Sequence, residues 1–250
     1  MVRRNSLVLG AAAWFSLLSP TLAQDAVPGE ILSRTFLIKV GDTFGTAFAI
    51  DYEGMLYVVT ARHVVAGLPE TKAVIQVQRA NRWLNLNTVK TLFPLSEDVD
   101  IAVFQTDEKV AQPYQIKSAE EVGGLTMGQQ VWFLGYPYGI HSSFSNGLEA
   151  PFIKKGTMSA IDATNPDAVV LYVDGFNNPG FSGGPIVYWD LNKHAYGIAG
   201  VVKGYKEDTA KVLINGQHVD TQLLVNSGIL VGYGINHAIQ AIKQSRAHQP

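Results

Sequence analysis

The sequence predicts an all-β protein, and three observations carry this prediction. Apolar residues recur in short runs separated by turn residues, the pattern of many short strands. Hydrophobic residues make up 47% of the 250 residues and charged residues only 16%, which excludes a disordered chain and a long helical one. The 24 glycines and 11 prolines supply the turns that such strands need.

The expected strands fall into two groups, which suggests two similar β units. The first group is residues 35–40, 45–50, 56–60, 73–78, 83–89 and 100–105. The second group is residues 130–135, 152–161, 169–173, 185–189 and 196–202, followed by a last strand that ends near Gly234. Residues 107–128 lack a strand pattern, so the predicted units are 30–110 and 129–235, joined by a linker over 111–128.

One helix is expected, at the C-terminal end. It begins at Asn236, whose side chain suits an N-cap, and continues to about Gln244 with an apolar stripe of Ala238, Ile239 and Ile242. Residues 236–250 are therefore predicted as a helix and tail.

The first 23 residues are predicted to be a secretory signal peptide. A basic start, MVRRNS, precedes an apolar run from Leu7 to Leu18 and small residues that end at Ala23, where we expect cleavage. The apolar run is shorter than a helix that spans a bilayer needs, which favours a cleaved signal over the alternative of a retained membrane anchor, and no stable membrane insertion is expected after cleavage. The protein is expected in the periplasm or outside the cell.

Charge and cysteine content exclude several functions. Cleavage would remove two arginines and no acid, leaving 17 basic and 21 acidic residues and a formal net charge of −4. No basic cluster indicates a nucleic-acid partner, and the pair Lys154 and Lys155 is interpreted as a solvated strand end. Without cysteine there is no disulfide, thiol nucleophile or thiolate metal site. No HExxH motif or His/Asp cluster is present, so no metal or other cofactor is predicted.

The motif GFSGGP, residues 180–185, has the composition of a nucleophile loop. A serine hydroxyl needs a base to remove its proton, and the tetrahedral intermediate that it forms needs donors for a developing oxyanion. Glycines beside Ser182 let the amides of Gly180 and Ser182 converge on one point. By itself the motif is also compatible with a glycine-rich turn.

A histidine and an aspartate lie at strand ends earlier in the chain. His63 follows the apolar strand YVVTA, where it could act as a positioned general base. Asp100 precedes the strand IAVFQ, where a partly desolvated carboxylate could hold the histidine tautomer, and Asp98 is a competitor. Each residue could equally be structural, but their conjunction with Ser182 on an all-β chain favours catalysis.

The order His, Asp, Ser resembles that of the chymotrypsin-like, or trypsin-like, serine proteases, and most closely the protease domain of the HtrA-like bacterial branch. GTAFAI, VVTARHVV, DVDIAVF, GQQVWFLGYPYG, KKGTMSAI, NNPGFSGGPIV and VGYGINHAIQAI follow that domain in order. The resemblance implies two six-stranded antiparallel β-barrels with the active site between them, and peptides or unfolded proteins as substrates. The absence of cysteine also fits this branch.

Carried over by position, the resemblance makes Ser182 the nucleophile, His63 the general base and Asp100 its orienting partner, with the amides of Gly180 and Ser182 as the oxyanion hole. Phe181 departs from the pattern, because vertebrate digestive relatives have there an Asp that pairs with a newly cut N-terminus. Activation through that ion pair is not available. The chain ends 16 residues after Gly234, so a PDZ domain is not expected.

The specificity pocket is predicted on two stretches around the serine. Phe176 and Asn177 are expected at its base, and Ala199, Gly200 and Val201 on its wall. Because no carboxylate lies at an obvious base position, we predict a preference for small or medium apolar residues before the cut. An extra segment, residues 205–227, is expected to shape or cover this pocket, and its Asn-Gly pair predicts a hairpin turn.

Two alternatives use the same residues. The motif also satisfies the G-x-S-x-G elbow of α/β-hydrolases, but that elbow requires a helix after the serine, whereas a strand-like run, PIVYW, follows here. The second alternative is a catalytically silent protease-like module that binds peptides or a partner. The presence of all three triad candidates and the glycines favours an active serine endopeptidase over it.

Overall fold

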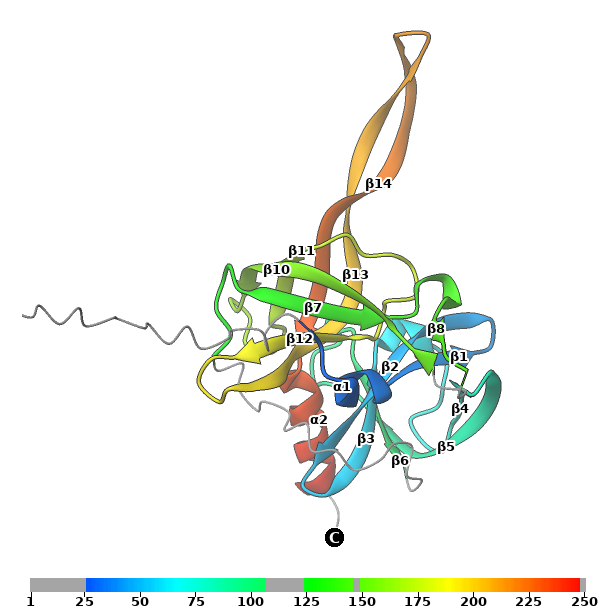
Figure 1. Cartoon of the computed structure of the whole chain (residues 1–250), viewed down its shortest axis with the longest axis vertical. Helices are drawn as coiled ribbons and strands as arrows, with labels where there is room; N and C mark the ends of the chain where they lie inside the picture. Colours follow the sequence, from blue (N-terminus) through cyan, green and yellow to red (C-terminus); the bar gives the residue numbers. More distant parts are fainter. Residues whose placement is uncertain (1–25, 107–123, 146–148, 248–250) are drawn as a thin grey trace, which may run out of the picture.

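The computed structural model describes residues 26–106, 124–145 and 149–247, which form two closed antiparallel barrels of six strands and a C-terminal helix (Figure 1). The predicted fold class is confirmed. The predicted signal peptide, residues 1–23, and most of the predicted linker, residues 111–128, lie outside the described residues. In the described ranges, no helix combines the length and apolar character that a membrane crossing requires.

The first barrel forms from the first half of the chain. Its strands are β1 (Thr35–Val40), β2 (Thr43–Tyr52), β3 (Met55–Thr60), β4 (Val74–Arg79), β5 (Arg82–Leu92) and β6 (Ala102–Thr106). Around the barrel their order is β1-β2-β3-β6-β5-β4, and β1 closes on β4 where Ile38 faces Val77. Alternating side chains fill the interior, each buried Phe or Ile contributing about 1.5–3 kcal/mol. The largest are those of Phe36, Ile38, Ile75 and Phe104.

The second barrel forms from the second half of the chain. Its strands are β7 (Gln130–Gly135), β10 (Phe152–Asp162), β11 (Val170–Asp174), β12 (Pro185–Asp190), β13 (Ala195–Ile214) and β14 (Gln217–Gly234). They follow the order β10-β11-β14-β13-β12-β7 around the barrel. Its interior packs large side chains that include Phe133, Met158, Phe181, Ile186 and Tyr188.

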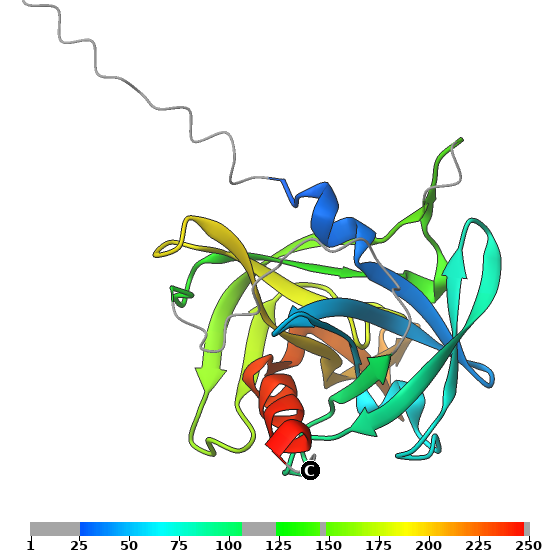
Figure 2. The same cartoon turned by 90° about the horizontal axis from the view of Figure 1, so that it is seen from below.

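A third apolar cluster joins the two barrels. It combines Phe48 and Val59 of the first barrel with Trp132 and Leu134 of the second. Helix α2 (Asn236–Ala247) adds to it through Ala238, Ile239 and Ile242, the stripe predicted from the sequence, and packs on β5, β6 and β14 (Figure 2). The barrels are therefore held in one relative orientation, which a site built from both requires.

Helix α2 is also fixed at its start by a buried histidine. The Nε2 atom of His237 accepts a 2.9 Å hydrogen bond from the backbone N–H of Val169. Burial lowers the pKa of His237, which favours the neutral ring that this bond needs. His237 thus has a structural role and lies outside the candidate active site.

Five short elements were not predicted. They are α1 (Gly29–Ser33), the 3₁₀ turns η2 (Arg62–Val65) and η3 (Pro137–Gly139), and the paired strands β8 (Ser142–Ser143) and β9 (Glu149–Ala150). Each has two to five residues, too few to set up a periodic apolar pattern. Of these, η2 matters most because it carries His63.

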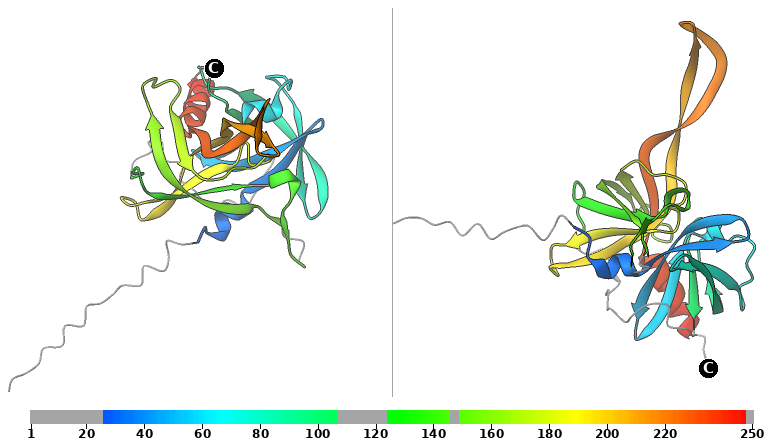
Figure 3. Two further views of the ribbon diagram at one scale, coloured as in Figure 1. Left: turned by 90° about the horizontal axis from the view of Figure 1, so that it is seen from above. Right: turned by 45° about the vertical axis from the view of Figure 1, so that its right-hand side comes forward.

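The two longest strands extend far beyond the second barrel. β13 and β14 remain paired from the barrel up to Ile214 and Gln217, and together they form an arm that stands away from both barrels (Figures 1 and 3). Asn215 and Gly216 make the turn at its tip, both with positive φ, as a two-residue hairpin turn requires. The predicted hairpin turn is confirmed.

Candidate active site

His63 and Asp100 meet because the strands beside them are neighbours. His63 lies in η2, directly after β3, and Asp100 lies shortly before β6. β3 and β6 pair antiparallel with Thr60 opposite Ala102, so one strand ends where the other begins. The first barrel therefore brings a histidine and a carboxylate to one edge, although 37 residues separate them in the sequence.

Asp100 holds His63 at two points. Its Oδ2 atom lies 2.5 Å from Nδ1 of His63, and its Oδ1 atom accepts a 2.8 Å hydrogen bond from the His63 backbone N–H. Since a carboxylate only accepts, Nδ1 carries the proton and Nε2 of the neutral ring keeps its lone pair. The Asp100 side chain is 13% exposed and that of His63 is 49% exposed. Asp100 thus orients the imidazole through its Nδ1 side, while about half of the His63 side chain stays exposed to solvent.

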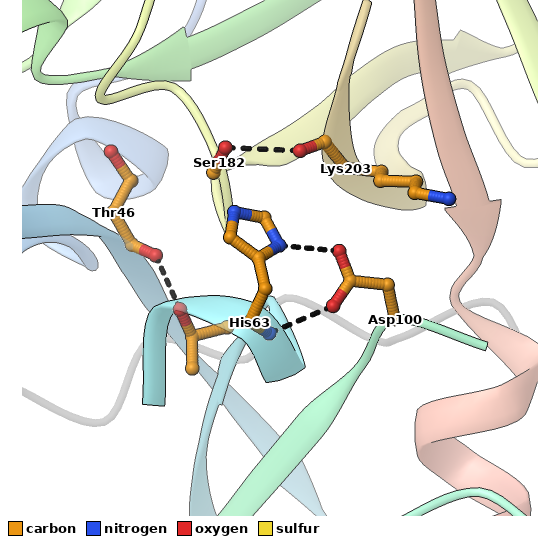
Figure 4. A network of polar contacts seen from close by, with 6 residues as sticks. Thr46, His63, Asp100, Ser182 and Lys203 are labelled. Carbon is orange, nitrogen blue, oxygen red and sulfur yellow. Dashed lines mark hydrogen bonds and ion pairs between the residues drawn. The ribbon is translucent and has the colours of Figure 1, made fainter. Parts of the chain in front are cut away.

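Ser182 reaches the same place from the second barrel (Figure 4). It lies in the loop between β11 and β12, and its Oγ donates a 2.9 Å hydrogen bond to the backbone carbonyl of Lys203 on β13. Within the described residues, no hydrogen bond joins Ser182 to His63, although the imidazole lies between Asp100 and Ser182. Rotation about the Cα–Cβ bond of Ser182 would turn its hydroxyl from Lys203 toward Nε2.

The peptide groups of the serine loop fix the directions of two amides. The carbonyl of Pro179 accepts a 2.9 Å bond from Tyr138 N–H, and that of Phe181 accepts a 2.8 Å bond from Gly184 N–H. Because a trans peptide is planar, the Gly180 and Ser182 N–H groups point opposite to these carbonyls. In the described part of the chain neither amide donates to a protein acceptor. Both are therefore available to an oxyanion.

Thr46 ties this loop to the first barrel. Its backbone N–H donates to the carbonyl of Ser182 at 2.8 Å, and its Oγ1 donates to the carbonyl of Gly180 at 2.7 Å. Thr60 in turn donates its hydroxyl proton to the carbonyl of Thr46 at 2.7 Å. The distance between the serine loop and the histidine is therefore set by direct bonds across the two barrels.

Two glycines of the motif are required by close backbone approach. Gly180 has φ +102°, and a Cβ there would lie 2.2 Å from the carbonyl oxygen of Tyr136. Gly183 has φ +85°, and a Cβ there would lie 2.1 Å from the carbonyl oxygen of Thr46. A side chain at either position would push the serine loop away from its neighbours.

A cleft of about 900 Å³ opens in front of the imidazole. His63, Asp98 and Asp100 line it from the first barrel, and residues 203–207 of β13 line it from the second. Asp98 thus faces the cleft, but the bonds to His63 come from Asp100. Of the two aspartates weighed from the sequence, the geometry favours Asp100.

The predicted wall of the specificity pocket needs a correction. Ala199 is fully buried in the core of the second barrel and Val201 in the cluster that joins the two barrels, and Gly200 packs beneath Leu171 and Tyr233. None of the three lines the cleft, because β13 is a buried strand of the barrel wall as far as Val202 and becomes exposed at the cleft only from Lys203. The apolar run that suggested a wall is a core strand, and the wall lies a few residues further on.

Phe176 and Asn177, the two residues predicted at the pocket base, differ in exposure. The Phe176 side chain is 56% exposed on the loop that precedes Ser182. Asn177 is buried, and its carbonyl accepts a 2.6 Å bond from the side-chain amide of Asn226 at the foot of the arm. Neither residue lines the cleft described above: Phe176 is exposed to solvent outside it, whereas Asn177 braces the loop.

The extra segment does not cover the pocket. Of residues 205–227, only Tyr205, Lys206 and Glu207 line the cleft, and the remainder projects away from it (Figure 3). The contact of Asn226 with Asn177 shows that the foot of the arm still supports the serine loop. The foot of the segment therefore lies at the cleft, whereas its tip does not cover it.

Shortening the arm is expected to leave cleavage of short peptides nearly unchanged. Deleting residues 208–225 and joining Glu207 to Asn226 through Asn-Gly keeps the cleft wall and the bond to Asn177. Because no residue that lines the cleft or contacts the catalytic side chains is removed, the activation free energy should hardly change and kcat/KM should stay within about twofold. Initial rates on a short-peptide library measure this. A tenfold loss, or a new cleavage preference in a folded variant, would contradict it.

Three residues at the site were not identified from the sequence. Thr46 bridges the barrels, Lys203 offers the carbonyl that Ser182 contacts, and Lys154 touches the serine loop. Thr46 lies within the run GTAFAI that carries the resemblance, and this was the one signal available for it. Lys203 and Lys154 act through contacts between strands distant in the sequence, which no local pattern reports.

The fold and this site together define a class of protein. Two closed six-stranded barrels, with a histidine and aspartate from one and a glycine-flanked serine from the other, are the arrangement of a serine peptidase. The model of the trypsin-like peptidase domain matches residues 45–198, more than half of the chain. The chain belongs to this family.

Known proteins agree with this assignment. Protease Do-like 1, chloroplastic, from Arabidopsis thaliana is 24% identical over 153 residues, 60% of this chain, and the chain spans about a third (32%) of that relative's length. The active form of the Rv3671c protease from M. tuberculosis superposes with a TM-score of 0.56 at 19% identity, over 89% of this chain and 85% of that one. The HtrA-type protease AlgW with a tripeptide superposes with a TM-score of 0.55 at 19% identity, over 88% of this chain and 62% of that one. At these identities the structures show the fold alone.

Proposed function

We propose that the protein is a serine endopeptidase that cleaves peptide bonds through an acyl-enzyme on Ser182. The observation that carries this proposal is the doubly bonded pair of His63 and Asp100, whose imidazole lies between Asp100 and Ser182 (Figure 4). The free amides of Gly180 and Ser182 support it further. Since the cleft is lined from both barrels, a polypeptide could pass through it, which favours internal cleavage.

Acylation would begin with rotation of the Ser182 hydroxyl from Lys203 to His63. Nε2 takes the hydroxyl proton while Oγ forms a bond to the scissile carbonyl carbon, whose oxygen becomes an oxyanion. The Gly180 and Ser182 amides would bind that oxyanion, and Asp100 would stabilise the imidazolium without taking its proton. Collapse breaks the C–N bond, and His63 gives its proton to the leaving amine.

Deacylation repeats the sequence with water as the nucleophile. His63 takes a proton from water, the resulting tetrahedral intermediate again uses the two amides, and its collapse releases the acid product. The proton returns from His63 to Ser182 Oγ. Each group is thus restored and no cofactor is consumed.

We propose peptides or unfolded proteins as substrates, with a small or medium apolar residue before the cut. The loop from Phe176 to Ser182 carries no acidic side chain, so nothing on it would pair with an Arg or Lys of the substrate. The ammonium of Lys154 lies 2.8 Å from the carbonyl of Phe176 and would repel such residues nearby. We also propose export to the periplasm or beyond, on the basis of the signal peptide predicted from the sequence of residues 1–23.

One observation favours the alternative of a silent peptide- or partner-binding module. The Ser182 hydroxyl is bonded to Lys203 and not to His63. However, catalytic hydrogen bonds are often long or misaligned without substrate, and one side-chain rotation corrects this one. The active enzyme therefore remains the better-supported proposal.

A fluorophosphonate probe tests the proposal directly. Oγ of an activated serine attacks phosphorus, fluoride leaves, and the protein is labelled covalently. Folded wild type should be labelled, whereas Ser182→Ala and heat-denatured wild type should not. Failure to label folded wild type, under conditions that label a known serine peptidase, would contradict the proposal and favour the silent module.

A further inference from the structure

The loop before Ser182 is held without the ion pair that digestive relatives use. Phe181 takes the place of their aspartate, and its side chain is fully buried in the second barrel. Its ring packs edge-on against Phe133 with centroids 5.3 Å apart, and its Cα lies 2.8 Å from where a Cβ on Gly135 would be. Apolar packing anchors the loop at Phe181, and the bonds described above hold Asn177, Pro179 and Gly180. The other two residues that precede Phe181, Phe176 and Asn178, are contacted by a side chain of β10.

Lys154 contacts those preceding residues. It lies on β10 opposite Phe133 of β7, and its Nζ donates to the carbonyl of Phe176 at 2.8 Å and to Oδ1 of Asn178 at 2.5 Å. The same ammonium lies 5.6 Å from the centroid of the Phe176 ring and 5.4 Å from that of Phe181. One cation therefore touches three of the six residues between 176 and 181.

Every group around this ammonium presents negative partial charge. Two oxygen acceptors and the faces of two aromatic rings converge on it, and a cation with several donors satisfies all of them. Burial lowers the pKa of Lys154, so part of its hydration has been exchanged for these contacts. The interpretation of Lys154 as a solvated strand end is therefore wrong, whereas Lys155 beside it is exposed.

The contacts continue from Lys154 to the proposed oxyanion hole. Asn178, whose side chain accepts from Lys154, accepts through its backbone carbonyl a 3.2 Å bond from Phe181 N–H. Phe181 begins the peptide group that carries the Ser182 amide, and Pro179, directly after Asn178, begins the one that carries the Gly180 amide. A displacement of Asn178 would therefore turn both amides.

We propose that Lys154 is a positioning residue that holds the loop of residues 176–181 in the conformation in which the Gly180 and Ser182 amides receive the oxyanion. This inference rests on the proposed function and adds to it one of the elements that hold the loop without that ion pair. This role of Lys154 has a specific consequence for catalysis. Loss of Lys154 weakens binding of the transition state more than binding of the substrate, because the oxyanion exists only after attack.

The test compares Lys154→Met with Lys155→Met, a matched change at the neighbouring exposed lysine. Loss of a hydrogen bond from a charged donor is expected to raise the activation free energy enough to lower kcat of Lys154→Met about tenfold. Its KM should stay within about twofold. Lys155→Met should change neither kcat nor KM. A peptide boronate, whose tetrahedral adduct with serine places an oxygen at the oxyanion position, should bind Lys154→Met about tenfold more weakly. Lys154→Arg, which keeps a cation and several donors, should recover part of kcat.

The outcomes separate this inference from the proposed function. If folded wild type hydrolyses no peptide and is indistinguishable from Ser182→Ala, the proposed function fails. If wild type is active and Lys154→Met keeps its kcat and boronate affinity, the positioning role is wrong and the function stands. Thermal unfolding shows whether each variant is folded. Should Lys154→Met fail to fold, Lys154→Gln replaces it, and equal kcat for Lys154→Gln and wild type overturns the inference.

Discussion

Replacing Ser182 with alanine is expected to lower kcat for peptide hydrolysis by about 10⁶-fold. The variant keeps the cleft, His63 and both amides but has no oxygen that can form the acyl-enzyme, so only water can attack. Catalysis of about 10³–10⁴ over the uncatalysed reaction should remain from binding and the oxyanion hole. Initial rates at saturating peptide, with stopped and continuous assays to span the range, measure the loss.

The matched control is Ser143→Ala, a serine exposed on β8 outside the cleft lining. It should keep wild-type kcat, since Ser143 contacts none of the groups of the proposed mechanism. Substrate affinity of Ser182→Ala should also be close to the wild-type value, because Oγ contributes little to ground-state binding. If Ser182→Ala kept kcat within tenfold of wild type, Ser182 would not be the nucleophile.

The second large effect is expected for Asp100→Asn, which should lower kcat by about 10⁴-fold. Asn has the size of Asp but presents an NH₂ group, and that donor can face Nδ1 only if the ring carries its proton on Nε2. The imidazole would then have no lone pair to take the serine proton. The change also weakens the bond from the His63 backbone N–H, which is 2.8 Å in the native pair.

Asp98→Asn is the control for this prediction. Asp98 lines the same cleft and lies two residues from Asp100, so both changes remove one negative charge from nearly the same place. If Asp100 acts through its two bonds to His63, only Asp100→Asn should be severely impaired. Equal losses in both variants would mean that the general charge of the cleft matters and that Asp100 has no special role.

Much of the fold could be predicted because strand patterns are local. The run TFLIKV predicted residues 35–40, and β1 has those bounds. The apolar stripe of α2 likewise appears as a spacing of three and four residues. Strand ends were less accurate, as at β13, because its exposed half keeps its pairing with β14 after the apolar pattern has ended.

The arm illustrates why a local pattern can predict a structure and miss its position. Asn215 and Gly216 predicted a hairpin turn, and the turn is there. Whether that hairpin folds over the cleft or stands away from it depends on the twist and pairing of β13 and β14 as they leave the barrel. The residues of the turn itself determine neither the twist nor the pairing of these strands.

The sequence by itself determined the strands, the helix, the turn residues and the types of side chain that catalysis needs, since these depend on neighbours within a few positions. Closure of the barrels determined which of these side chains lie close together. It brought His63 beside Asp100, set Thr46 and Lys154 against the serine loop, and moved the cleft wall from residues 199–201 to residues beyond Val202. These contacts join strands far apart in the chain, and their distances follow from sheet register and core packing, which only the tertiary structure contains.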